Sequence, residues 1–245
     1  MTNGHSTIAQ RLAGACMTVA AVLAIAACGD EAASGSPDFS AADLAGLNFA
    51  PDAIPEMDYQ ADASGAGAFA AQQREQAKEE GDEGGLELVR RLEELGLEAD
   101  HVSQFFATSR HAKPVFAESV AFLFEDEEAA EEAVEIVRVA NAANLDSARS
   151  IDVPDLGEEA FGARGDFDGF LVYSYGWRMG DVIQVATVAP GDNDAGPEST
   201  LELADELEAK AQQQRTTLPR RDVNYVGSNY SRLRTGRPPV GEPAD

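Results

Sequence analysis

Residues 170–188, FLVYSYGWRMGDVIQVATV, decide the fold that this sequence can adopt. Two runs rich in β-branched and aromatic residues, 170–177 and 182–188, flank a short segment that contains Gly180-Asp181. This pattern is typical of two antiparallel strands that are joined by a tight turn. The stretch therefore predicts a β-hairpin, and the neighbouring elements are expected to pack around it.

A further strand and a helix are expected immediately upstream of this hairpin region. Residues 115–124 are apolar on both faces of a strand, especially Val120-Ala-Phe-Leu-Phe124. Two apolar faces are typical of a strand at the covered centre of a sheet. Residues 127–142 then predict a helix whose first turn is acidic, as the helix dipole favours.

Three more segments show helical patterns. Residues 71–80 are rich in helix-forming residues. Residues 86–97 predict a helix with one apolar face, formed by Leu86, Val89, Leu92 and Leu95. A last helix is expected to reach about Gln214, with Ser199 as its N-cap and Glu202 as the capping-box partner.

The order of these elements predicts an α+β fold, a mainly antiparallel sheet packed with helices in a single domain. We assign that domain to residues 46–214. Residues 28–45 are rich in Ala, Gly, Ser and Asp and are expected to form a flexible tether. Residues 215–245 hold six Arg, three acids and four Pro, which predicts a disordered basic tail. The region around Phe105-Phe106 is interpreted as a loop, and residues 156–162 are assigned to a glycine-rich segment without a strand.

The charge balance argues against nucleic acid as a partner. The 245 residues include 18 Lys and Arg against 44 Asp and Glu, and the formal net charge is -26. Such an acidic chain repels phosphate backbones. Apolar residues make up 44% of the chain, which is enough for a hydrophobic core.

The N-terminal residues 1–27 predict a signal peptide. A polar start that ends at Arg11 precedes 16 mostly apolar residues, fewer than the ~20 that a transmembrane helix needs. Cys28 directly follows Ile25-Ala26-Ala27.

This sequence around Cys28 resembles the bacterial lipobox, which is an aliphatic residue, two small residues and a cysteine. The resemblance to bacterial lipoproteins implies diacylglyceryl transfer to the Cys28 thiol, cleavage before Cys28 and acylation of the new amino terminus. The chain would then be lipid-anchored on the extracytoplasmic face of a cell membrane, with membrane lipid as a partner. Cys16 follows Ala13-Gly14-Ala15 but lies within the apolar run, so it is expected to be removed with the leader.

The layout of residues 115–214 is also similar to small, uncharacterised α+β envelope lipoproteins of actinobacterial type. The likeness rests on element order, on Leu156-Gly-Glu-Glu-Ala160 and on Trp-Arg-x-Gly-Asp-Val at 177–182. It implies a binding, sensor or scaffold role in the cell envelope, with an envelope protein or a small ligand as partner. Two alternatives stay open, a solute-binding component of a transporter and a hydrolase that acts on the cell wall.

No catalytic motif stands out in the sequence, and we name no catalytic residue. His101 and His111 follow the leader without any H-E-x-x-H spacing, and there is no G-x-S-x-G or P-loop pattern. Either histidine is a candidate for the hydrolase alternative. A non-enzymatic role is favoured on this basis.

Calcium is the one cofactor for which candidate ligands exist. Asp192, Asp194 and Glu198 place carboxylate oxygens at alternating positions in a presumed loop, but they do not complete the EF-hand pattern. The same residue types are also ordinary turn formers.

The strand at 170–177 places Leu171, Tyr173, Tyr175 and Trp177 on one face. The favoured interpretation is core packing under a helix. The alternative is an aromatic platform for a lipid, glycan or peptide, formed by Tyr173, Tyr175 and Trp177, with Arg178 placed to bind a carboxylate. Arg178 could equally pair with one of the many acids of the chain.

Overall fold

The computed structural model describes residues 39–217, apart from residues 56, 82, 108–112, 154, 168 and 192–195. The strands are β1 (Met57–Tyr59), β2 (Gly65–Ala66), β3 (Leu97–Ala107), β4 (Phe116–Phe124), β5 (Asp146–Ser150), β6 (Glu159–Phe167), β7 (Phe170–Met179) and β8 (Val182–Ala189). The helices are α2 (Leu44–Leu47), α3 (Ala68–Glu80), α4 (Gly84–Glu94), α5 (Glu127–Ala143) and α6 (Glu198–Thr217). They confirm the expected α+β class.

The eight strands form one antiparallel sheet in the order β1-β3-β4-β8-β7-β6-β5, with β2 also paired to β3. The predicted hairpin is present as β7 and β8, which Gly180 and Asp181 connect. Gly180 has a φ of +64°, a left-handed conformation that glycine adopts without strain. The expected central strand is β4, whose nine residues are all buried between β3 and β8.

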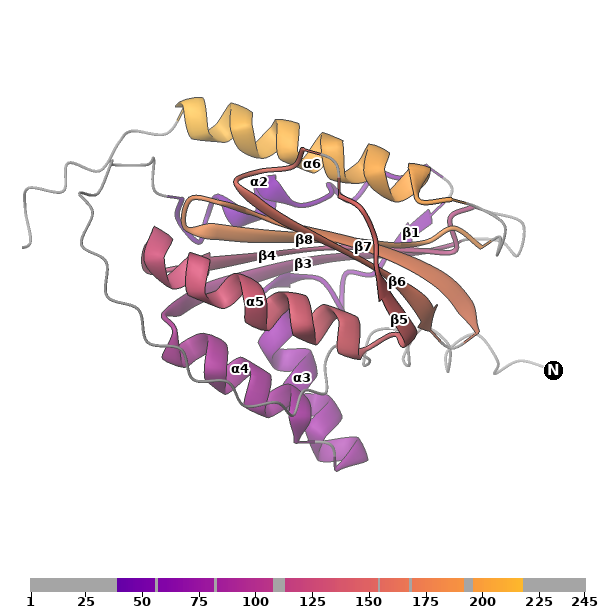
Figure 1. Cartoon of the computed structure of the whole chain (residues 1–245), viewed down its shortest axis with the longest axis horizontal. Coiled ribbons are helices and arrows are strands. Elements are labelled where there is room, and N and C mark those ends of the chain that lie inside the picture. The colour runs from indigo at the N-terminus through magenta and orange to yellow at the C-terminus, as the bar shows by residue number, and fades with distance from the viewer. Residues whose placement is uncertain are drawn as a thin grey trace, which may run out of the picture.

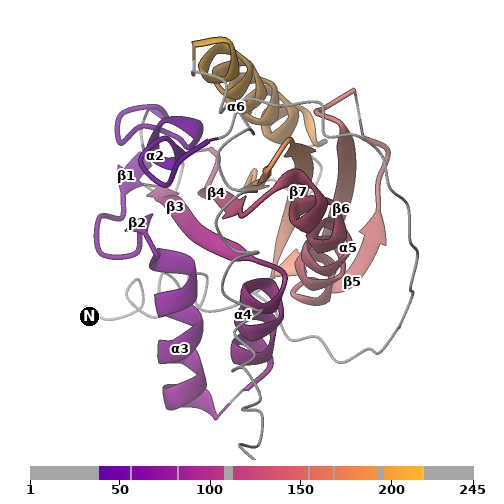
Figure 2. The same ribbon diagram turned by 90° about the vertical axis from the view of Figure 1, so that its left-hand side faces the viewer.

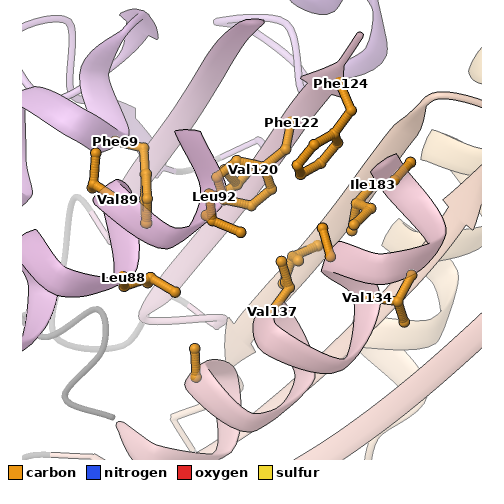
Figure 3. Close-up of a cluster of buried hydrophobic side chains, with 14 of the residues drawn as sticks. Phe69, Leu88, Val89, Leu92, Val120, Phe122, Phe124, Val134, Val137 and Ile183 are labelled. Carbon is orange, nitrogen blue, oxygen red and sulfur yellow. The ribbon is translucent and has the colours of Figure 1, made fainter. Parts of the chain in front are cut away.

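The helices α3, α4 and α5 cover one face of this sheet, and α2 and α6 cover the other (Figures 1 and 2). On the first face, apolar side chains from α3, α4, β4, β8 and α5 converge in one cluster (Figure 3). Its larger members include Phe69, Leu88, Val89, Leu92, Val120, Phe122, Phe124, Val134, Val137 and Ile183. Burial of each such side chain contributes roughly 1.5–3 kcal/mol, so this cluster fixes α5 and the α3–α4 pair on the sheet.

The apolar face of α4 differs by one position from the expected face. Leu88, Val89 and Leu92 are buried, but Leu86 is 36% exposed, so its predicted inward position is wrong. The helix begins at Gly84, and its covered side starts with Gly85, where a Cβ atom would lie 2.0 Å from Gln73 Oε1. Gly85, Leu88, Val89 and Leu92 share the buried face at spacings of three and four residues, and Leu86 lies outside that face.

The helical layer formed by α2 and α6, together with Phe39, extends beyond both bounds of the expected domain, residues 46–214. Phe39, Leu44 and Leu47 pack on the sheet together with Ala211 of α6, so residues from Phe39 onward that we assigned to the tether belong to the core. The capping role of Ser199 is wrong, because α6 already includes Glu198 and the Leu201 N–H donates to the Pro197 carbonyl oxygen at 2.9 Å. No helix within the described residues is long and apolar enough to cross a membrane.

Two strands occupy segments to which we assigned no strand. β3 lacks a simple apolar alternation because Asp100 and Gln104 are buried on one face and Ser103 on the other. β6 is rich in glycine because neighbouring chain lies close to it. A Cβ atom at Gly165 would be 2.6 Å from the Leu145 Cβ atom and 2.9 Å from the Asp146 carbonyl oxygen.

The N-terminus of α5 provides a first test of the fold. The Asp126 carboxylate accepts a hydrogen bond from the Ala129 N–H at 2.8 Å, so it caps an otherwise unpaired backbone group. We expect Asp126→Ala to lower the free energy of unfolding by about 1 kcal/mol in urea denaturation. Asp126→Asn keeps a capping oxygen and is the control. Equal losses for both variants would contradict the capping role.

Candidate functional site

The predicted aromatic platform on β7 is covered. Tyr173, Tyr175 and Trp177 are all buried, and Trp177 has no exposed surface. Tyr175 and Trp177 belong to an apolar cluster that includes Leu207 of α6. Burial raises the pKa of Tyr175, and the neighbouring Tyr173 and Glu198 act in the same direction. α6 lies over these rings, as the favoured interpretation of core packing under a helix expects, so they do not form an open platform in this structure.

Arg178 is also buried, and it pairs with acids. Its Nη1 lies 2.8 Å from Glu158 Oε2 and 3.3 Å from Glu127 Oε1, and it donates to the Gly180 carbonyl oxygen at 3.3 Å. Arg215 of α6 contacts the other oxygen of Glu158 at 2.9 Å. We call Arg178, Glu158, Glu127 and Arg215 the arginine network. Nη1 of Arg178 is thus paired with acids of this chain, while its Nε is buried without a partner, so Arg178 is not presented to a ligand carboxylate from solvent.

The proposed calcium ligands fall mostly outside the described residues. Asp192, Asp194 and the lipidation residue Cys28 lie there, whereas Glu198 is the exposed first residue of α6. Within the part of the chain that the structure describes, no three His, Cys, Asp or Glu side chains come together as a metal site would require. Calcium binding at 192–198 stays a prediction.

The residues considered for catalysis serve the fold where they are described. The Asn48 amide donates to Nδ1 of His101 at 3.2 Å, and burial lowers the pKa of His101. Ser119 accepts a hydrogen bond from the Phe49 N–H at 3.2 Å. These contacts attach the segment after α2 to the sheet. His111 lies outside the described residues.

A buried acid of the sheet caps a helix. Asp100 of β3 accepts a hydrogen bond from the Phe69 N–H, at the start of α3, at 2.9 Å. Burial raises the pKa of Asp100, although hydrogen bonds from the Phe69 and Ala70 amides oppose the rise. Its role is to hold the first turn of α3 against β3.

One cluster of buried polar groups has no such structural explanation. Gln104, Glu118, Thr187 and Ser174 lie on four adjacent strands, β3, β4, β8 and β7, and are direct cross-strand partners. Their side chains share the face that α5 covers. The Ser174 hydroxyl donates to Asn141 Oδ1 of α5 at 3.0 Å and lies 2.9 Å from the Thr187 hydroxyl. We call these five residues the polar row.

Glu118 is the ionisable member of the polar row. The Gln104 amide Nε2 donates to Glu118 Oε2 at 2.5 Å. Burial raises the pKa of Glu118 to about 7, while this hydrogen bond acts in the opposite direction. Two atoms of the row, Gln104 Oε1 and Asn141 Nδ2, are buried without a hydrogen-bond partner. Other buried side chains, Gln73 and Arg178 among them, also have unpaired atoms, so it is the buried acid Glu118 that marks the row as the candidate site.

Sequence reasoning missed this site, although one signal was present. Glu118 interrupts a strand that was predicted to be buried on both faces, and buried glutamates are unusual. Its partners could not be found from the chain order, because Gln104 lies in a segment interpreted as a loop. Comparison of the chain with protein-family models, curated proteins and solved structures found no match.

Proposed function

We propose that this protein is a membrane-anchored, extracytoplasmic lipoprotein with a non-enzymatic binding, sensor or scaffold role in the cell envelope. The observation that carries the proposal is Cys28, directly after Ile25-Ala26-Ala27 and an apolar leader. Acyl chains on Cys28 would contribute roughly 0.8 kcal/mol for each buried methylene group, and two or three chains give a stable anchor.

The position of the first buried residue supports an anchor close to the domain. Phe39 is 2% exposed and packs with Leu44 and Leu47 on the sheet. The eleven residue steps from Cys28 to Phe39 can span at most about 40 Å. An anchored domain would therefore be held close to the bilayer surface, attached through the α2 region.

The described interior supports binding or sensing rather than catalysis. Asp100 caps α3, His101 accepts a hydrogen bond from Asn48, and Arg178 pairs with Glu158 and Glu127. These are the groups that catalysis would need, and each already has a structural partner. The polar row differs in holding a buried acid, Glu118, whose single side-chain hydrogen bond in the described structure comes from a neutral amide.

The anchor can be tested with one substitution. In a bacterial host, the full chain with Cys28→Ala should lose incorporation of a labelled fatty acid and should no longer fractionate with membranes as a lipid-modified protein. Cys16→Ala is the matched control and should behave like the parent chain. Fatty-acid labelling that persists in Cys28→Ala, or that disappears in Cys16→Ala, would contradict the proposal.

A further inference from the structure

Glu118 has an unusual environment for an acid. It is 8% exposed and lies between Phe116 and Val120 on the same face of β4. In the described part of the chain, no Lys, Arg or His pairs with it, and its only hydrogen bond comes from Gln104. A negative charge at this position would be poorly solvated and uncompensated.

The elements around Glu118 contribute few charged groups. The cross-strand neighbours are Gln104 on β3 and Thr187 on β8. Among the described residues, no charged group contributes to the shift in the pKa of Glu118, for which burial and the Gln104 hydrogen bond are the causes. On the same sheet face, Asp100 and Arg178 lie level with Phe122, four residues along β4, and Asp58 lies level with Phe116 at the sheet edge.

The hydrogen bonding of Gln104 indicates which protonation state of Glu118 the folded domain accommodates better. Its Nε2 donates to Glu118 Oε2, while its Oε1 is buried without a donor. A neutral carboxyl group has one O–H donor and a carbonyl acceptor, whereas a carboxylate has acceptors alone. A carboxamide has the complementary set. Neutral Glu118 can therefore supply the donor that Gln104 Oε1 lacks, and ionised Glu118 cannot.

We propose that Glu118 is a proton-binding site of the folded domain, at which the neutral carboxyl group forms two hydrogen bonds with the Gln104 carboxamide. Release of the proton to water removes the O–H donor, leaves Gln104 Oε1 unpaired and places a charge in the centre of the sheet. The proton is the ligand, and the contact between β3 and β4 is the part of the fold that responds. This inference concerns the folded domain and does not depend on acylation of Cys28.

The direction of the pH effect follows from the pKa of Glu118, which is raised from 4.5 to about 7 by burial. Between these two values the folded protein binds more protons at this site than the unfolded chain does. Stability from Glu118 is therefore fully present below about pH 4.5 and is lost as the pH rises through about 7. At this one group, a fall in pH from 8 to 5 should stabilise the folded domain.

The test compares Glu118→Gln with the parent chain, both purified as full chains, by urea unfolding at pH 5 and pH 8. Glutamine retains the amide pairing with Gln104 and cannot ionise. We expect the parent and the variant to have similar unfolding constants at pH 5, and the variant to have an unfolding constant about 100-fold lower at pH 8. The reason is that each unit by which the pKa of Glu118 differs between the folded and the unfolded chain changes the unfolding constant about tenfold once the group is ionised. Glu131→Gln, at an exposed position of α5, is the control and should show no such change.

A second measurement keeps the inference testable if Glu118→Gln does not fold. Carbon-13 NMR of side-chain carboxyl groups in the parent chain should show one glutamate that titrates near pH 7. Midpoints near 4.5 for every glutamate would overturn the inference. So would a Glu118→Gln variant whose unfolding constant, relative to the parent, is the same at pH 5 and pH 8.

Discussion

Trp177→Ala is expected to lower the free energy of unfolding by about 3–5 kcal/mol. Trp177 has no exposed surface and belongs to the cluster that joins β7 to α6, with Leu207 and Ala204 on the helix side. Removal of the indole ring deletes these contacts and leaves a cavity, and α6 cannot collapse into it without losing its contacts with β8. Urea denaturation of the parent and the variant measures the loss.

A matched control separates this core role from the alternative of a ligand platform. Leu86→Ala deletes an apolar side chain that is 36% exposed, and it should cost less than about 1 kcal/mol. If Trp177 lay on an open surface, Trp177→Ala would resemble that control. A loss below about 1 kcal/mol for Trp177→Ala would contradict the packing of α6 on β7.

The case of Trp177 shows what alternation along a strand can and cannot predict. Alternation correctly placed Tyr173, Tyr175 and Trp177 on one face of β7, since successive side chains point to opposite sides. The sequence favours cover of that face by a helix, but alternation could not predict which helix. The cover is α6, which begins more than 20 residues later and packs there through Ala204, Leu207 and Ala211.

The polar row shows a different limit of sequence reasoning. The hairpin and α5 are set by local patterns, and both were predicted from them. Gln104, Glu118, Thr187 and Ser174 come together through strand pairing between segments that are far apart in the chain. Local periodicity carries no information on such pairing. The buried polar residues of β3 also interrupt its apolar alternation, so the segment was not predicted as a strand.

Arg178→Ala should cost about 4 kcal/mol at pH 7, the second large effect. Arg178 is 8% exposed, and its Nη1 contacts Glu158 at 2.8 Å and Glu127 at 3.3 Å. Removal of the guanidinium group leaves Glu158 with Arg215 and the Gly180 N–H as partners. The Glu158 side chain is a third exposed and can regain some water when Arg178 is removed. The cost of the substitution should therefore not exceed the usual range for a broken buried ion pair.

The pH dependence gives this prediction a second readout. Burial acts to raise the pKa of Glu158, but hydrogen bonds from Gly180 and Arg215 and the charges of Arg178 and Arg215 together hold it below its ordinary value. Stability from this group is therefore present above the unfolded pKa and is lost as the pH falls through the lower folded value. The cost of Arg178→Ala should accordingly be smaller at pH 3 than at pH 7. Glu158 thus stabilises the folded domain at higher pH, whereas Glu118 stabilises it at lower pH.

A comparison with a surface pair shows why position decides the size of the effect. Arg138 contacts Glu135 one helical turn away on α5, and both side chains are largely exposed. Arg138→Ala should change the free energy of unfolding by less than about 0.5 kcal/mol. Arg178 instead links the start of α5, through Glu127, with Glu158, which Arg215 of α6 contacts in turn. The arginine network thus connects helices on both faces of the sheet beside the β7–β8 turn. If Arg178→Ala lowered the free energy of unfolding by no more than Arg138→Ala does, this connection would contribute nothing to stability.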